Sequence, residues 1–142
     1  MEETATPLDE TESHRPLTSA ELQRLAASHV IEIGAHTMTH PTLALAPVED
    51  QQREIEGCRA ALERVLGKPV NAFAYPYGNV FDDYTAESVS LVRDARFDLG
   101  FTTCASFATV KDDPLQIPRF MMLDTVGDVE LAHRLMFSWR SA

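Results

Sequence analysis

Apolar residues recur at the three-to-four-residue spacing of helices in several stretches of the chain. Thr18 and Glu21 form a capping-box pair, which predicts a helix that begins here and ends near Ser28. Pro47 suits the first turn of a second helix, where a missing N–H costs nothing, and Gly67 predicts its end. We expect both helices to turn one apolar side towards a core.

Two further helices are expected in the second half of the chain. Thr85 is a candidate cap for a helix that runs to about Arg96. A last helix should run from about Gly127 to Trp139. Its apolar spacing predicts a set of inward-facing side chains: Val129, Ala132, Leu135, Met136 and Trp139.

Strands are expected between these helices, where short apolar runs end at glycine, proline or polar residues. The expected strands are Val30–Gly34, Val70–Tyr75, Leu99–Thr103 and Ile117–Phe120. Alternation of strand and helix is typical of an α/β fold with a mostly parallel sheet. An eight-unit barrel of this type takes ~250 residues, so 142 residues can build only an incomplete, partial barrel.

Composition narrows the class of protein. Hydrophobic residues make up 44% of the chain, which suits a globular domain with a core. The net charge of −10 argues against nucleic acid or an anionic membrane as a partner. Residues 1–16 form an acidic arm and residues 17–142 the domain, and two isolated cysteines, Cys58 and Cys104, fit a reducing compartment. The acidic start shows no export signal, so we expect a cytoplasmic protein unless the start is truncated.

The sharpest chemical signal is a pair of histidines in the segment HTMTHP, residues 36–41, directly after an expected strand. On one helical turn His36 and His40 would face the same side and could bind one metal ion. The carboxyl ends of parallel strands are also where α/β proteins place their sites. A pair of packed or hydrogen-bonded histidines without a metal is the alternative.

A second candidate segment is FAYPYG, residues 73–78, which also ends an expected strand. Its Pro-Tyr-Gly order predicts a stiff turn that can aim an N–H at a ligand, although aromatic packing is the alternative. Tyr75, Pro76 and Tyr77 are therefore candidate substrate-binding residues. The segments GFTT (100–103) and IPRF (117–120) are weaker signals, in which Arg119 could hold a carboxylate.

Taken in order, HTMTHP, a helix that ends in LGKPV, FAYPYG, GFTT and PRF resemble the polysaccharide deacetylase family, also called the NodB-homology domain or carbohydrate esterase family 4. The resemblance runs from about Pro16 to Arg119. HTxxHP and PYG are specific at this separation, and neither is specific alone. The resemblance implies the distorted, TIM-barrel-like β/α barrel of that family, here in part.

The resemblance also implies a reaction, the metal-dependent removal of N- or O-acetyl groups from a carbohydrate. In the family, the histidines that match His36 and His40 bind a divalent metal, usually zinc, together with an aspartate. The backbone N–H of the tyrosine that matches Tyr77 supports the oxyanion. An aspartate acts as the base and a late histidine as the acid. His133 is the late histidine here, although its place on an expected helix favours a helix-face residue instead.

The chain departs from the family at the first motif, T-F-D-D-G, which supplies the base and the metal-binding aspartate. The residues before His36 contain no such strand. Asp9 lies in the polar arm and is a poor substitute. Asp82 and Asp83 have the right letters, but they lie in the loop after PYG and fit a solvated loop or a helix cap.

A second departure is Ala74, which takes the place where many relatives carry an arginine that orients the base. Arg119, on a neighbouring expected strand, is the candidate replacement.

Two neutral imidazoles bind a metal less firmly than two imidazoles and a carboxylate. We therefore expect the isolated chain to hold Zn²⁺ weakly.

Two functions follow from these residues. The first is a metal-dependent, deacetylase-like hydrolase that acts on an acetylated carbohydrate, inactive in isolation if the first motif is missing. The alternative is a non-catalytic, barrel-derived module that self-associates or binds a sugar or a protein. A partial parallel sheet leaves unpaired edges, so a homo-oligomer that covers them is expected.

Overall fold

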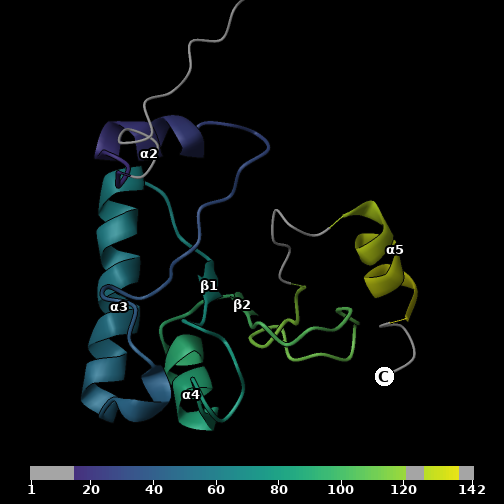
Figure 1. Cartoon of the computed structure of the whole chain (residues 1–142). Coiled ribbons are helices and arrows are strands. Elements are labelled where there is room, and N and C mark those ends of the chain that lie inside the picture. The colour runs from purple at the N-terminus through teal and green to yellow at the C-terminus, as the bar shows by residue number, and fades with distance from the viewer. Residues whose placement is uncertain (1–14, 121–126, 138–142) are drawn as a thin grey trace, which may run out of the picture. The chain divides into compact units, whose positions relative to one another are not determined.

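A computed structural model of the chain describes residues 15–120 and 127–137 (Figure 1). Contacts within the chain divide it into two units, Met1–Glu32 and Ile33–Ala142. Within the described ranges, none of the helices combines the length and the apolar character needed to cross a bilayer. The expected boundary between an arm of residues 1–16 and a domain of residues 17–142 remains a prediction.

The first unit contains helix α2 (Ser19–Ala26), whose start confirms the expected capping box. The Thr18 hydroxyl accepts a hydrogen bond from the Glu21 N–H at 3.3 Å, and the Glu21 carboxylate accepts one from the Thr18 N–H at 2.8 Å. A hydrogen bond from the Arg15 guanidinium, together with those from Thr18, holds the pKa of Glu21 well below its usual range. Local bonds alone therefore define this helix, since none of its residues is buried.

In the second unit, helices α3 (Val48–Leu66) and α4 (Ala86–Asp94) pack against each other. Helix α3 ends as predicted at Gly67, which adopts the left-handed conformation with φ 66°. A buried hydrogen bond joins the two helices, because the Ser88 hydroxyl donates to the Gln51 side-chain oxygen at 2.7 Å. The Ser88 hydroxyl also accepts a hydrogen bond from the Thr85 N–H, which marks the expected start of α4.

The sheet of this unit consists of two parallel strands, β1 (Ala72–Ala74) and β2 (Leu99–Phe101). Single parallel bridges continue the pairing on both sides, from Ala35 to Phe73 and from Phe101 to Ile117. The parallel α/β arrangement is thus confirmed. Strands and helices are arranged in the predicted order along the chain (Figure 1).

The expected strands at Val30–Gly34 and Ile117–Phe120 are wrong as strands. No residue of Val30–Gly34 pairs, since the bridge lies at the next residue, Ala35, and the second segment pairs at Ile117 only. Val30 is 91% exposed, so its β-branched side chain packs on no sheet neighbour. The two inner strands form where predicted but are only three residues long.

The core lies between the strands and helices α3 and α4, and it is largely apolar. The fully buried Tyr75 and Tyr84 rings stack at its centre, with ring centroids 4.0 Å apart. Gly100 allows β2 and the segment at Leu115 to approach each other closely, because a Cβ at position 100 would lie 2.3 Å from the Leu115 carbonyl oxygen. The buried apolar residues are Ala35, Leu43, Ile55, Cys58, Val70, Phe73, Tyr75, Tyr84, Val89, Val92, Phe97 and Leu115.

Helix α5 (Asp128–Phe137) forms where the last helix was expected. The inward orientation predicted for Val129 and Ala132 is wrong, because both are exposed, Val129 at 85%. Helical spacing identifies an apolar side of a helix but not what covers it. The side chains of Leu135 and Met136, and the whole of Trp139, lie outside the described parts of the chain.

Candidate functional site

The first histidine is held by the backbone of β1. Pairing of Ala35 with the strand places His36 beside Ala74, since the Ala74 N–H donates to the Ala35 carbonyl at 2.9 Å. The His36 Nδ1 lies 2.7 Å from the Ala74 carbonyl oxygen. A carbonyl can only accept, so Nδ1 carries the proton and Nε2 is left with a lone pair. This arrangement is typical of histidines that bind metals through Nε2.

The structure brings both imidazoles and the Tyr77 ring together. The centroids of the His36 and His40 rings lie 4.7 Å apart, and those of His40 and Tyr77 lie 4.8 Å apart, both in edge-to-face contacts. All three residues are exposed. The cluster of His36, His40 and Tyr77 therefore forms one accessible group of side chains.

A loop rather than a helical turn produces this convergence, so the expected helical geometry is wrong. Thr37 and His40 both adopt the left-handed conformation, with φ 61° and 60°. The Thr37 hydroxyl donates to the His36 carbonyl at 2.6 Å and accepts from the His40 N–H at 3.1 Å. Glu54 of α3 accepts further hydrogen bonds from the loop. The tight loop therefore brings the His36 and His40 rings into contact.

The Pro-Tyr-Gly segment forms the expected tight turn, with φ 59° at Tyr77 and 79° at Gly78. Thr103, after β2, fixes the turn by donating from its hydroxyl to the Tyr77 carbonyl at 2.6 Å and from its N–H to the Gly78 carbonyl at 3.0 Å. A Cβ on Gly78 would lie 2.8 Å from the Thr103 nitrogen, so only glycine fits. Within the described residues the Tyr77 N–H has no acceptor. It remains a donor for a ligand.

Tyr75 and Pro76, also predicted to contact substrate, are buried. The Tyr75 hydroxyl donates to the Leu115 carbonyl at 2.9 Å. Burial, with the nearby Tyr84, raises the pKa of Tyr75. Both side chains are therefore closed to a ligand in this structure, and any contact from these residues would come from their backbone.

Arg119 is engaged with the loop after β2. Its Nε donates to the Thr102 carbonyl at 2.8 Å, and its backbone N–H donates to the Cys104 carbonyl at 3.1 Å. Its predicted role in orienting a base stays a prediction. His133 lies on α5 with an exposed side chain, and its predicted role as the acid is likewise a prediction.

Asp82 and Asp83 act within their own loop. Asp83 accepts a hydrogen bond from the Asn79 N–H at 2.8 Å, and Asp82 accepts one from the Asn79 side-chain amide at 2.7 Å. These bonds close the loop that follows Gly78. They agree with the structural role that the sequence favoured over a ligand role.

The donor set matches a metal in type but not in number. Imidazole nitrogens suit Zn²⁺, and the Ala74 carbonyl behind His36 supplies the partner that such ligands require. Zinc sites in enzymes use three protein ligands. Among residues 15–120 and 127–137, no group of three or more His, Cys, Asp or Glu side chains could hold an ion. His36 and His40 would therefore supply only two of the three ligands of such a site.

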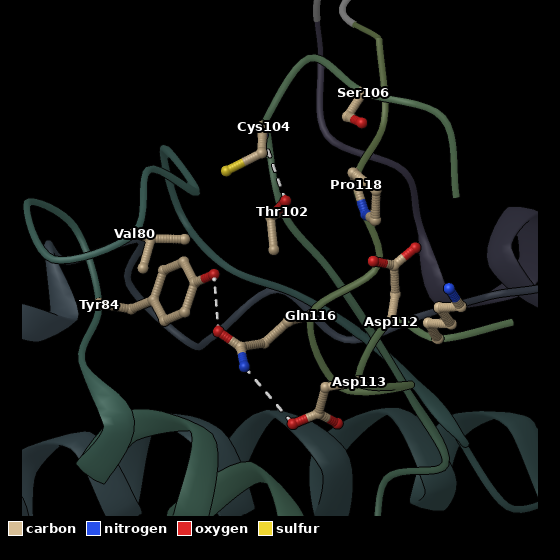
Figure 2. A pocket seen from close by; sticks show the side chains of 10 residues that line it. Val80, Tyr84, Thr102, Cys104, Ser106, Asp112, Asp113, Gln116 and Pro118 are labelled. Carbon is tan, nitrogen blue, oxygen red and sulfur yellow. Dashed lines mark hydrogen bonds between the residues drawn. The ribbon is translucent and has the colours of Figure 1, made fainter. Parts of the chain in front are cut away.

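A separate cavity of about 380 Å³ lies beside the loop after β2 (Figure 2). Gln116 spans its wall, with its side-chain oxygen 3.4 Å from the Tyr84 hydroxyl and its nitrogen 3.4 Å from the Asp113 carboxylate (Figure 2). Lys111 and Cys104 also line the cavity. The cluster of His36, His40 and Tyr77 does not line it, so this cavity is not the site of the two motifs.

Comparison with known proteins decides the family. Residues 7–99, well over half of the chain, match the family model for polysaccharide deacetylase. The chain belongs to this family. The matched segment includes both histidines and the Tyr77 turn, and it ends before Arg119 and His133. A search of curated proteins found no match.

Solved structures of deacetylases share the fold. The deacetylase PplD of Streptococcus pyogenes, in complex with acetate, has a TM-score of 0.75 at 23% identity, over 88% of this chain and 53% of that one. For a polysaccharide deacetylase from Bacillus cereus the TM-score is 0.71 at 24% identity, over 84% and 36%. A de-N-acetylase from Aggregatibacter actinomycetemcomitans gives 0.69 at 12%, over 83% and 53%.

These likenesses confirm the expected fold, part of the deacetylase barrel. The chain spans about half the length of the first and third of these proteins and about a third of the second.

Proposed function

We propose that this deacetylase-family chain forms part of a metal-dependent hydrolase that removes acetyl groups from a carbohydrate. The observation that carries the proposal is the convergence of His36, His40 and Tyr77 in one exposed cluster. The family match supplies the class of reaction.

His36 and His40 would hold the ion, with zinc the favoured metal. His36 presents Nε2 because the Ala74 carbonyl occupies the proton on Nδ1. When bound, a divalent ion would activate a water molecule and polarise the acetyl carbonyl. A carboxylate from outside the described residues would complete the ligand set, so binding by two imidazoles alone should be weak.

Tyr77 would contribute through both its backbone and its ring. Its N–H has no acceptor among the described residues and belongs to the turn that Thr103 fixes, and the Tyr77 ring of that turn contacts His40. A donor held rigidly in this way can stabilise the negative charge that develops on an acetyl oxygen. Its ring, 57% exposed and in contact with His40, would form one wall of the acetyl site.

An acetylated carbohydrate is the proposed substrate class. The structural relatives include a de-N-acetylase and a deacetylase in complex with acetate. The net charge of −10 favours a neutral or cationic polymer over a polyanion.

The test is release of acetate from an acetylated chitooligosaccharide and from acetylated xylan, with and without added Zn²⁺. We expect weak zinc binding and at most slow release of acetate, which should need zinc, and both should be lost in His36→Ala and His40→Ala. His29→Ala, which removes an exposed histidine of the other unit, should leave the rate unchanged. A chain that neither binds zinc nor releases acetate would contradict the proposal.

One observation favours a second candidate, a non-catalytic module that binds a sugar or a protein or pairs with its own copy. The sheet continues as single bridges beyond both strands, at Ala35 and Ile117. Short pairing of this kind leaves backbone groups for a further strand. A dimer without metal and without acetate release, measured by sedimentation, would favour this candidate.

A further inference from the structure

Glu54 on α3 binds the loop between the two histidines with both of its carboxylate oxygens. The N–H groups of Met38 and Thr39 donate to Oε2 at 2.7 and 2.8 Å. The Thr39 hydroxyl donates to Oε1 at 2.7 Å. Hydrogen bonds to an ionised carboxylate are stronger than those between neutral groups.

The loop depends on such support because its backbone is unfavourable by itself. Thr37 is β-branched and adopts the left-handed conformation, which such residues rarely do. His40 shares this conformation. Strained positions of this kind persist only where surrounding contacts hold them. The bonds to Glu54 lie between the two strained residues in the sequence.

Helix α3 offers a fixed base for this support. Glu54 precedes Ile55, which is completely buried, and lies one turn before Cys58, which is also buried. At Gly57 an added Cβ would touch the Met38 side chain at 3.4 Å. One side of α3 therefore contacts the loop at Met38 and Thr39.

We propose that Glu54 is a positioning residue: it fixes the loop so that the His36 and His40 imidazoles stay together as a preformed pair for one cation. The inference rests on the proposed metal function of that pair. Glu54 acts through the loop and not as a ligand, because both of its oxygens already accept hydrogen bonds from Met38 and Thr39.

The first test uses the metal-free chain and two NMR readouts, hydrogen exchange at Met38 and Thr39 and the nuclear Overhauser effect between the His36 and His40 rings. In Glu54→Ala we expect at least tenfold faster exchange at both amides and loss of the ring contact. Glu54→Gln should lie between, since a carboxamide offers one accepting oxygen. Glu56→Gln, an exposed neighbour on α3, should match the wild type. Unchanged exchange at Val92 in the core shows that the fold persists.

The second test measures Zn²⁺ affinity of the same four proteins by calorimetry. Loss of a residue that orients metal ligands typically weakens binding 10- to 100-fold, and we expect a loss in this range for Glu54→Ala and none for Glu56→Gln. Unchanged amide exchange, an unchanged ring contact or an unchanged zinc affinity in Glu54→Ala would overturn the inference. Failure of the wild type to bind zinc would contradict the proposed function itself, and the two NMR readouts would show separately whether Glu54 holds the loop.

Discussion

Single side chains at the strand ends face either the core or the site, and two neighbouring tyrosines show the contrast. Tyr75 points inward, with its ring stacked on Tyr84 and its hydroxyl on the Leu115 carbonyl. Tyr77, two residues later, is exposed and touches His40. The sequence FAYPYG made both tyrosines candidates, but it did not indicate which one is exposed, because that depends on where the chain turns at Pro76.

This contrast predicts that removing the hydroxyl lowers the free energy of unfolding by different amounts at the two tyrosines. Tyr75→Phe leaves the Leu115 carbonyl without its buried donor, which should lower the free energy of unfolding by about 1–2 kcal/mol. Tyr77→Phe removes a hydroxyl from an exposed ring and should change it by less than about 0.5 kcal/mol. Urea denaturation of the two variants measures the difference, and equal values would contradict the placement of Tyr75.

The helices were predictable from sequence because their ends are set by local signals. The Thr18–Glu21 pair and Gly67 act within a few residues of the ends that they define. The strands were not predictable in length, since a strand extends only as far as its partner, and Val30 has none. The histidine loop was predictable only in part. Its two imidazoles were found by spacing, whereas Glu54, which supports them, comes from the following helix and left no local signal.

Because β2 passes close to the segment around Leu115, a side chain at Gly100 should destabilise the fold. Gly100→Ala would place a Cβ 2.3 Å from a backbone oxygen, and neither strand nor loop can shift without breaking hydrogen bonds. We expect a loss of about 3 kcal/mol or more. Gly67→Ala serves as the control, because nothing lies within 4 Å and only the left-handed φ is strained, at about 1 kcal/mol. A smaller loss at Gly100 than at Gly67 would contradict the described packing.

In the second unit, two half-buried carboxylates, Glu63 and Glu54, hold segments of the chain together by hydrogen bonds. Glu63 accepts hydrogen bonds from the Arg59 side chain at 2.9 Å and from the Val70 N–H at 3.0 Å, and these lower its pKa. At Glu54 burial raises the pKa, but the bonds from Thr39 and Met38 outweigh this and lower it. Both groups therefore bind protons more weakly in the folded chain.

Stability should accordingly depend on acid pH. A lowered folded-state pKa stabilises the chain above the unfolded value, about 4.3 for glutamate, and this contribution is lost as the pH falls through the folded value. We expect the free energy of unfolding to decline below about pH 4, and Glu63→Gln to decline less steeply. Urea denaturation between pH 3 and 7 measures both slopes. A variant as pH-sensitive as the wild type would show that Glu63 is not linked to folding.

For the whole molecule, the family match covers residues 7–99, and the chain spans only part of the length of its structural relatives. The central claim is that His36 and His40 act together on one ion. The chain has five histidines, and His29, which has no predicted role in the site, serves as the internal control.

The most direct measurement is an NMR spectrum of the imidazole nitrogens during titration with Zn²⁺ at neutral pH. We predict that His36 starts with its proton on Nδ1, and that the Nε2 signal of His36 and the ring signals of His40 shift together at the same zinc concentration. The signals of His29 should stay in place. Shifts at His29 that equal those of the pair, or no shift at the pair at all, would contradict the account.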